Sequence, residues 1–150
     1  MKMFIAMAIL LLAMGSAQAE CLYLGNLDEC MHEAKNGNPI AQYILGTHYE
    51  NGEGVAQDYT EAKNWYHKAA EQGDRDAQYR LGLLYQHGRG ILKDTTRAYM
   101  WFEVASVNGL PAALEEKSML AGEMTPAEIG KAENMATDWL IANPAEAGDQ

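Results

Sequence analysis

The 150-residue chain has few of the features by which enzymes and nucleic-acid-binding proteins are recognised. It contains no G-x-S-x-G, H-E-x-x-H, Walker or C-x-x-C motif, so no reaction can be assigned from sequence motifs. Basic residues are scarce: 11 lysines and arginines stand against 21 aspartates and glutamates, a net charge of −10. Because nucleic-acid phosphates bind clustered basic side chains, this balance argues against a nucleic-acid partner.

Cysteine occurs only twice, at Cys21 and Cys30. One continuous helix would hold these residues roughly 13 Å apart, whereas bonded cysteines have Cα atoms ~6 Å apart. A disulfide between them therefore requires a turn, which Gly25-Asn26 can provide. The two alternatives are this bond, as a staple for the N-terminal end, and a pair of unpaired thiols.

The longest apolar run covers only residues 3–14, which is short of the ~20 residues that a membrane-spanning helix needs. Lys2 precedes the run, and Ala17-Gln18-Ala19 follows it as a small-x-small cleavage site. This layout predicts a secretory signal peptide at residues 1–19 and a periplasmic or secreted product. A lipoprotein at Cys21 is the competing interpretation, although Glu20 stands where such signals carry a small residue.

The middle of the chain repeats itself at an interval of 36 residues. Residues 41–76 and 77–112 align without a gap, and 14 of the 36 positions are identical. A fixed period of this length is typical of stacked repeats, in which each unit buries its apolar face against its neighbours. The identical pairs include Tyr43/Tyr79, Leu45/Leu81, Gly46/Gly82, Tyr49/Tyr85, Asp58/Asp94, Trp65/Trp101 and Gly73/Gly109.

Each repeat has the pattern of two helices joined by a glycine turn, which predicts an all-α fold. In the first repeat, Ala41, Leu45 and Tyr49 recur along one helical stripe. Gly52 and Gly54 allow the positive φ of a tight turn between helices. The second helix has Asp58 at its N-cap and Ala62, Trp65, Tyr66 and Ala69 on its apolar face.

We therefore divide the chain into a signal peptide and a short repeat array with a cap at each end. The predicted segments are the signal peptide (1–19), an N-terminal capping helix region (20–40), repeat 1 (41–76), repeat 2 (77–112), a degenerate C-terminal repeat or cap (113–142) and a flexible tail (143–150).

From Ala41 to Gly73 the first repeat reads A-x-x-x-L-G-x-x-Y-x-x-G-x-G-V-x-x-D-x-x-x-A-x-x-W-Y-x-x-A-A-x-x-G. This string resembles the repeat of the Sel-one-like repeat family, an α/α relative of the tetratricopeptide repeats. The second repeat departs from it at Ile91, Phe102 and Ser106. The resemblance implies a right-handed α/α superhelical solenoid that acts as a non-enzymatic protein-interaction adaptor, often in the bacterial envelope.

A helical wheel predicts where a partner binds. With Leu45 pointing inward, three residues of the first helix fall near the opposite side. By analogy with tetratricopeptide stacks, this side lines a concave groove, where Leu83 between two tyrosines is a typical interface anchor. The alternative is that these residues pack against neighbouring helices and bind nothing. The predicted groove consists of Tyr43, Thr47 and Glu50 with their equivalents Tyr79, Leu83 and Gln86.

No metal site or cofactor is predicted. None of the four histidines has another histidine three or four residues away, and none recurs in the other repeat. The leading hypothesis is therefore a periplasmic adaptor for another protein. The alternatives are a cell-wall-related or β-lactam-binding enzyme, and a secreted effector that contacts a host protein. A cysteine-rich branch of the family is linked to β-lactam binding, but the two repeats here contain no cysteine.

Overall fold

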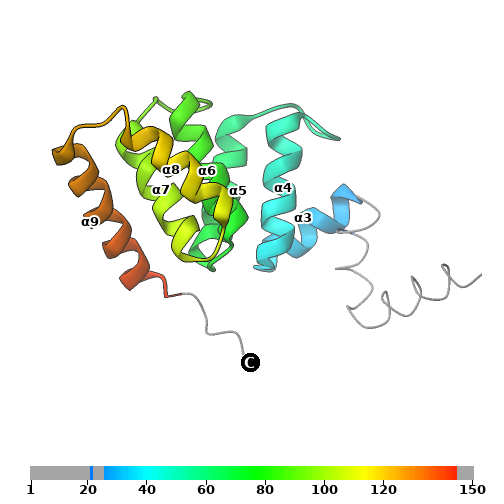
Figure 1. The fold of residues 1–150 in the computed structure, drawn as a ribbon. Coiled ribbons are helices and arrows are strands. Elements are labelled where there is room, and N and C mark those ends of the chain that lie inside the picture. The colour runs from blue at the N-terminus through cyan, green and yellow to red at the C-terminus, as the bar shows by residue number, and fades with distance from the viewer. Residues whose placement is uncertain (1–20, 22–25, 145–150) are drawn as a thin grey trace, which may run out of the picture.

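The computed structural model describes Cys21 and residues 26–144, and this part of the chain is helical throughout, without strands (Figure 1). The predicted signal peptide and residues 145–150 of the predicted tail lie outside the described residues. Among the helices described, none is long and apolar enough to cross a membrane. The elements are α3 (Leu27–Lys35), α4 (Pro39–Asn51), α5 (Tyr59–Glu71), α6 (Arg75–His87), α7 (Thr95–Val107), α8 (Pro111–Ala121) and α9 (Pro126–Ala142).

The helices of the two repeats begin at short polar residues that cap them. Asn38 and Asp58 each accept hydrogen bonds from two backbone N–H groups, and Asp74 and Asp94 each accept one. A cap of this type stabilises a helix by about 1 kcal/mol. At the other ends, α4 and α6 stop at glycines in the left-handed conformation, Gly52 and Gly88. The predicted helix boundaries in the repeats therefore follow from local chemistry.

The helices stack in chain order as antiparallel hairpins. α4 pairs with α5, and α6 pairs with α7. Between units, α3 packs against α4, α6 packs against α5, and α8 packs against α7. We call α4, α6 and α8 the A helices, and α5 and α7 the B helices. The all-α repeat architecture predicted from the period of 36 residues is thus confirmed.

The Leu-Gly pairs of α4 and α6 are each explained by an aromatic ring of the B helix that follows. A Cβ atom at Gly46 would lie 2.5 Å from the Tyr66 ring, and one at Gly82 would lie 2.5 Å from the Phe102 ring. Both rings are fully buried. Glycine is therefore required in the middle of these helices, where it lowers helix propensity, because only it lets the ring approach.

A buried glutamine ties three helices together in each repeat. Gln42 donates to the carbonyl of Ala34 at the end of α3 and accepts from Gln72 after α5. Gln78 does the same with Ala70 after one repeat interval, and it accepts from Asn108. Each amide adds a second hydrogen bond to a carbonyl that already accepts a backbone N–H, from Gly37 at Ala34 and from Gly73 at Ala70, and it fixes the spacing of successive units.

The C-terminal helix leaves the repeat pattern. α9 packs against α7, whereas a further unit would pack it against α8. Its Trp139 ring lies 4.6 Å from the Trp101 ring and 5.3 Å from the His67 ring, between centroids, so it contacts both B helices. On α8, Leu114 and Ser118 stand at the registers of the buried glutamine and the close-packed glycine, and both are exposed. α8 thus lacks the Leu-Gly pair because no following helix in the described part of the chain packs against it as α5 packs against α4 and α7 against α6.

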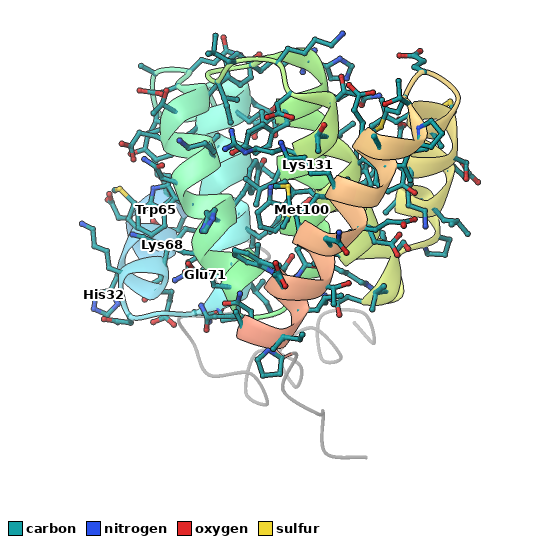
Figure 2. The ribbon with its side chains drawn as sticks, turned by 90° about the vertical axis from the view of Figure 1, so that its left-hand side faces the viewer. His32, Trp65, Lys68, Glu71, Met100 and Lys131 are labelled. Carbon is teal, nitrogen blue, oxygen red and sulfur yellow. A yellow bond between two sulfur atoms is a disulfide. The ribbon has the colours of Figure 1, made fainter. Side chains whose placement is uncertain are left out.

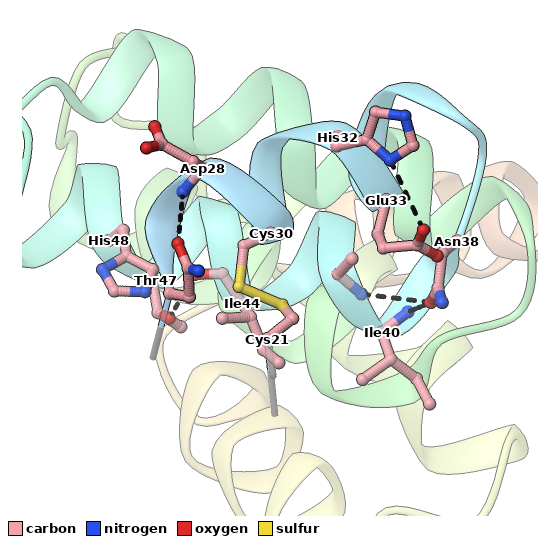
Figure 3. The surroundings of a disulfide bond; sticks show 12 residues. Cys21, Asp28, Cys30, His32, Glu33, Asn38, Ile40, Ile44, Thr47 and His48 are labelled. Atoms are coloured by element: carbon pink, nitrogen blue, oxygen red, sulfur yellow. Dashed lines mark hydrogen bonds and ion pairs between the residues drawn. A yellow bond between two sulfur atoms is a disulfide. The ribbon is translucent and has the colours of Figure 1, made fainter. Parts of the chain in front are cut away.

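The N-terminal end is closed by a disulfide between Cys21 and Cys30 (Figure 3), with Cα atoms 4.8 Å apart. Both cysteines are buried, and with Ala34, Ala41 and Leu45 they form a small apolar cluster separate from the main core. Trp65 packs against this cluster but is only partly buried, with the Lys68 amine 4.1 Å from its ring centroid (Figure 2). It is therefore not a core residue like Trp101, which is 4% exposed.

Candidate functional site

Five of the six residues predicted to bind a partner lie partly exposed on the A helices. They are Tyr43 and Thr47 on α4 and Tyr79, Leu83 and Gln86 on α6, although the side-chain oxygen of Gln86 is buried. At the next repeat interval, Met119 on α8 continues the row from Thr47 through Leu83 and is 60% exposed. We call the surface formed by Tyr43, Thr47, Tyr79, Leu83 and Met119 the A-helix face.

Packing and exposure coexist in the two tyrosines of this face. The Tyr43 ring lies 5.8 Å from the Tyr66 ring, and the Tyr79 ring lies 5.6 Å from the Phe102 ring, between centroids. Each tyrosine therefore covers the buried ring of its own B helix and still presents part of its surface outward. Rings held in this way lose little conformational entropy when a partner covers them.

Glu50 does not lie on the A-helix face, and its assignment to a groove floor is wrong. It is only 8% exposed, and its carboxylate accepts a 2.5 Å hydrogen bond from the Tyr66 hydroxyl of α5. On a wheel, Glu50 lies about 140° from Leu45. It is nevertheless buried because α4 has neighbours on several sides, so one inward direction underestimates the arc that is covered.

The Glu50 carboxylate also binds the next A helix. An Nη1 atom of Arg80 lies 3.8 Å from Glu50, so Glu50, Tyr66 and Arg80 link α4, α5 and α6. Burial and the hydrogen bond to Glu50 raise the pKa of Tyr66 far above its ordinary value. Burial opposes the charge of Arg80, but the hydroxyls of Tyr43 and Tyr66 and the charge of Glu50 outweigh it, so the pKa of Arg80 is raised. We call this arrangement the first bridge.

The raised pKa of Tyr66 predicts a loss of stability in alkali that Tyr66→Phe should lack. The unfolded chain releases this proton above pH ~10, whereas the folded chain retains it, so the stabilisation is complete below pH 10 and falls as the pH rises. The wild type should lose about 1.4 kcal/mol more per pH unit than the variant above pH 10. Urea unfolding between pH 8 and 12 measures the difference, and parallel pH profiles would contradict it.

In the second repeat, the positions equivalent to the first bridge hold side chains of different chemistry. Gln86 stands at the register of Glu50, Phe102 at that of Tyr66, and Glu116 at that of Arg80. The Gln86 amide nitrogen donates to the Glu116 carboxylate over 3.4 Å. Its amide oxygen is buried, and within the described part of the chain it has no hydrogen-bond partner. We call this arrangement the second bridge.

Adding a hydroxyl to the second bridge should stabilise the protein. The Phe102 ring contacts Gly82 as the Tyr66 ring contacts Gly46, so in Phe102→Tyr the hydroxyl should reach Gln86 as that of Tyr66 reaches Glu50. Pairing the buried oxygen should add about 0.5 to 1.5 kcal/mol to the free energy of unfolding. Urea unfolding at pH 7 measures the gain, and a destabilised variant would show that the ring positions differ.

One group of potential metal ligands escaped the sequence search, which considered only pairs of histidines. Glu29, His32 and Glu33 have ligand atoms within 4.8 Å of one another on α3. His32 is largely exposed and lies 3.6 Å from the Glu33 carboxylate (Figure 3), which is the geometry of a surface ion pair. The spacing of three residues from Glu29 to His32 and of four from Glu29 to Glu33 would have revealed the group.

A hollow of about 280 Å³ lies at the C-terminal ends of α6 and α8. Its lining carries both charge signs, with Lys93 and Glu123, and it includes Gln86 and Met119. A second, larger hollow, of about 560 Å³, lies between Pro39, Gln72 and Asn143. Among the described residues, Glu71 is the only charged one in its lining.

Stacked helical hairpins, a capped N-terminal end and a face of partly exposed aromatic and aliphatic side chains define an α/α repeat scaffold. The chain carries two Sel1 repeats, matched at residues 39–74 and 75–109, and proteins with such repeats are generally protein-interaction scaffolds. The matched repeats begin two residues before those read from sequence identity, close to the first residues of α4 and α6.

Two solved structures show the same fold. One is a protective antigen present in uropathogenic Escherichia coli strains that displays an SLR fold, with 28% identity and a TM-score of 0.79 over 85% of this chain. The other is a Sel1 repeat protein from Oxalobacter formigenes, with 28% identity and a TM-score of 0.65 over 83% of this chain. The matches cover 29% and 54% of those chains, respectively, so both relatives are longer. No curated protein matches the chain.

Proposed function

We propose that the protein is a non-enzymatic adaptor of the bacterial periplasm that binds another protein on its A-helix face. The observation that supports this proposal is the row formed by Thr47, Leu83 and Met119 beside Tyr43 and Tyr79. Aromatic rings, leucine and methionine form the buried centre of many interfaces. In this protein they lie on helices that the repeat contacts already hold rigid.

The test is the recovery of a crosslinked partner by variants of this face. Leu83→Glu combined with Met119→Glu places two charges on the row, and we expect recovery of the partner from intact cells to fall at least tenfold. Leu92→Glu is the control because Leu92 is 89% exposed in the turn before α7 and is not one of the residues of the A-helix face. Equal recovery by the two variants, with unchanged melting, would refute the proposed site.

The proposed location rests on the sequence of residues 1–19. Fractionation of cells that express the tagged protein should place a processed product, beginning near Glu20, in the periplasmic fraction. One structural neighbour is a protective antigen present in uropathogenic Escherichia coli strains, so a host-directed effector is the alternative to test. A processed product found mainly in the culture medium would favour the effector over the periplasmic adaptor.

A further inference from the structure

We propose that the part of the A-helix face on α6 and α8 binds a cationic side chain of the partner polypeptide, arginine or lysine, through Glu116. This inference rests on the proposed function and names the chemistry of the partner. It comes from comparing the two bridges, which occupy equivalent positions in successive repeats. The first contains its own cation, and the second contains none.

In the first bridge the protein's own arginine shows what this position accepts. The Arg80 guanidinium lies beside the buried carboxylate of Glu50 and interacts with the Tyr43 hydroxyl. The acceptors come from the preceding A helix, and the cation comes from the next one. The negative charge of Glu50 is thereby compensated within the chain, so this half of the A-helix face has no carboxylate to offer a partner.

In the second bridge a carboxylate occupies the place of the guanidinium. Among the described residues Glu116 forms no salt bridge: the neighbouring Lys117 pairs with Glu103 of α7, and Arg80 pairs with Glu50. The one hydrogen bond that Glu116 receives, from Gln86, is 3.4 Å long and comes from a neutral amide. Its negative charge is therefore not compensated by a cation of the described chain.

The surroundings of Glu116 suit a basic side chain of a partner. Exposed Glu115 precedes it on α8. Burial and then the negative charges of Glu116 and Glu115 raise the pKa of Tyr79, against the opposing charge of Arg80. Leu83 and Met119 flank the position with apolar surface on which the alkyl part of arginine or lysine can lie. The net charge of −10 attracts a basic segment at longer range.

The experiment uses two blocked tetrapeptides, acetyl-Leu-Arg-Leu-Gly-amide and the same peptide with citrulline, which replaces the guanidinium by a neutral group of the same shape. Each is titrated into the isotopically labelled protein and followed by NMR. The arginine peptide should shift the signals of Leu83, the Gln86 side-chain amide and Glu116 in a saturable way. Its affinity should exceed that of the citrulline peptide about fivefold or more.

Glu116→Gln should remove this preference for arginine while the circular dichroism spectrum stays unchanged. Asp138→Asn is the matched control, since it removes one exposed carboxylate of α9 and the same net charge, and it should keep the preference. If Glu116→Gln did not fold, the triple variant Gln86→Glu, Phe102→Tyr and Glu116→Arg, which copies the first bridge, should fold and also lack the preference.

Equal affinities of the two peptides, shifts confined to another acidic surface, or a preference that survives Glu116→Gln would each overturn this inference. The proposed function would still stand if Leu83→Glu with Met119→Glu abolished partner recovery in that case. Loss of both effects would refute the function and the inference together.

Discussion

Replacing Trp101 by alanine should lower the free energy of unfolding by about 3 to 5 kcal/mol, as expected for a large buried aromatic side chain. Trp101 is 4% exposed, and its ring contacts both the His67 and the Trp139 rings. Its removal leaves a cavity at the point where α5, α7 and α9 meet. Because the array is short, urea unfolding followed by circular dichroism should show one cooperative transition, shifted to lower urea concentration.

Trp65→Ala is the control for this prediction, because Trp65 holds the same position in the first repeat. It is only partly buried, against the cluster around the disulfide, so we expect less than half of the loss seen for Trp101→Ala. Equal losses for the two variants would show that α9 does not cover Trp101 in solution.

Gly82→Ala should destabilise the protein by about 2 kcal/mol, although alanine favours a helix more than glycine does. The added Cβ would lie 2.5 Å from the Phe102 ring, which is fully buried and cannot move without displacing its neighbours. Overpacking of this kind costs about 1 to 3 kcal/mol, occasionally more, and the better helix propensity returns at most about 1. Thermal or urea unfolding gives the net effect.

Gly130→Ala should change the stability in the opposite direction. Gly130 lies inside α9, and a Cβ at this position would meet no atom within 4 Å. Only the helix propensity changes, so this variant should gain up to about 1 kcal/mol. A stabilised Gly82→Ala variant would mean that the ring of Phe102 yields, and that the close approach does not explain the Leu-Gly pair.

The repeat architecture could be predicted because its signals are local or periodic. The caps at Asn38, Asp58 and Asp94 and the turn glycines determine where helices start and stop. The interval of 36 residues then determines which surfaces meet, since every unit must bury the same stripe. These features depend on nearby residues and on repetition, both of which can be read from one sequence.

The candidate site was harder to predict because it depends on which neighbour covers each residue. Glu50 turned inward because Tyr66 offers it a hydroxyl and Arg80 a charge, and neither is adjacent in sequence. The exchange of Glu50 with Tyr66 for Gln86 with Phe102 was a usable signal, since an acceptor and its donor change together. That α9 packs against α7 instead of α8 had only an indirect signal, the loss of the Leu-Gly pair on α8.

The position of α9 has a mechanical consequence. An open array of repeats can bend and twist, because each unit contacts only its neighbours. In this protein Trp139 reaches both Trp101 and His67, so one helix braces units that would otherwise flex against each other. The distance between Tyr43 and Tyr79 should therefore vary little. A ligand that contacts both must match that distance, because the array cannot stretch to meet it.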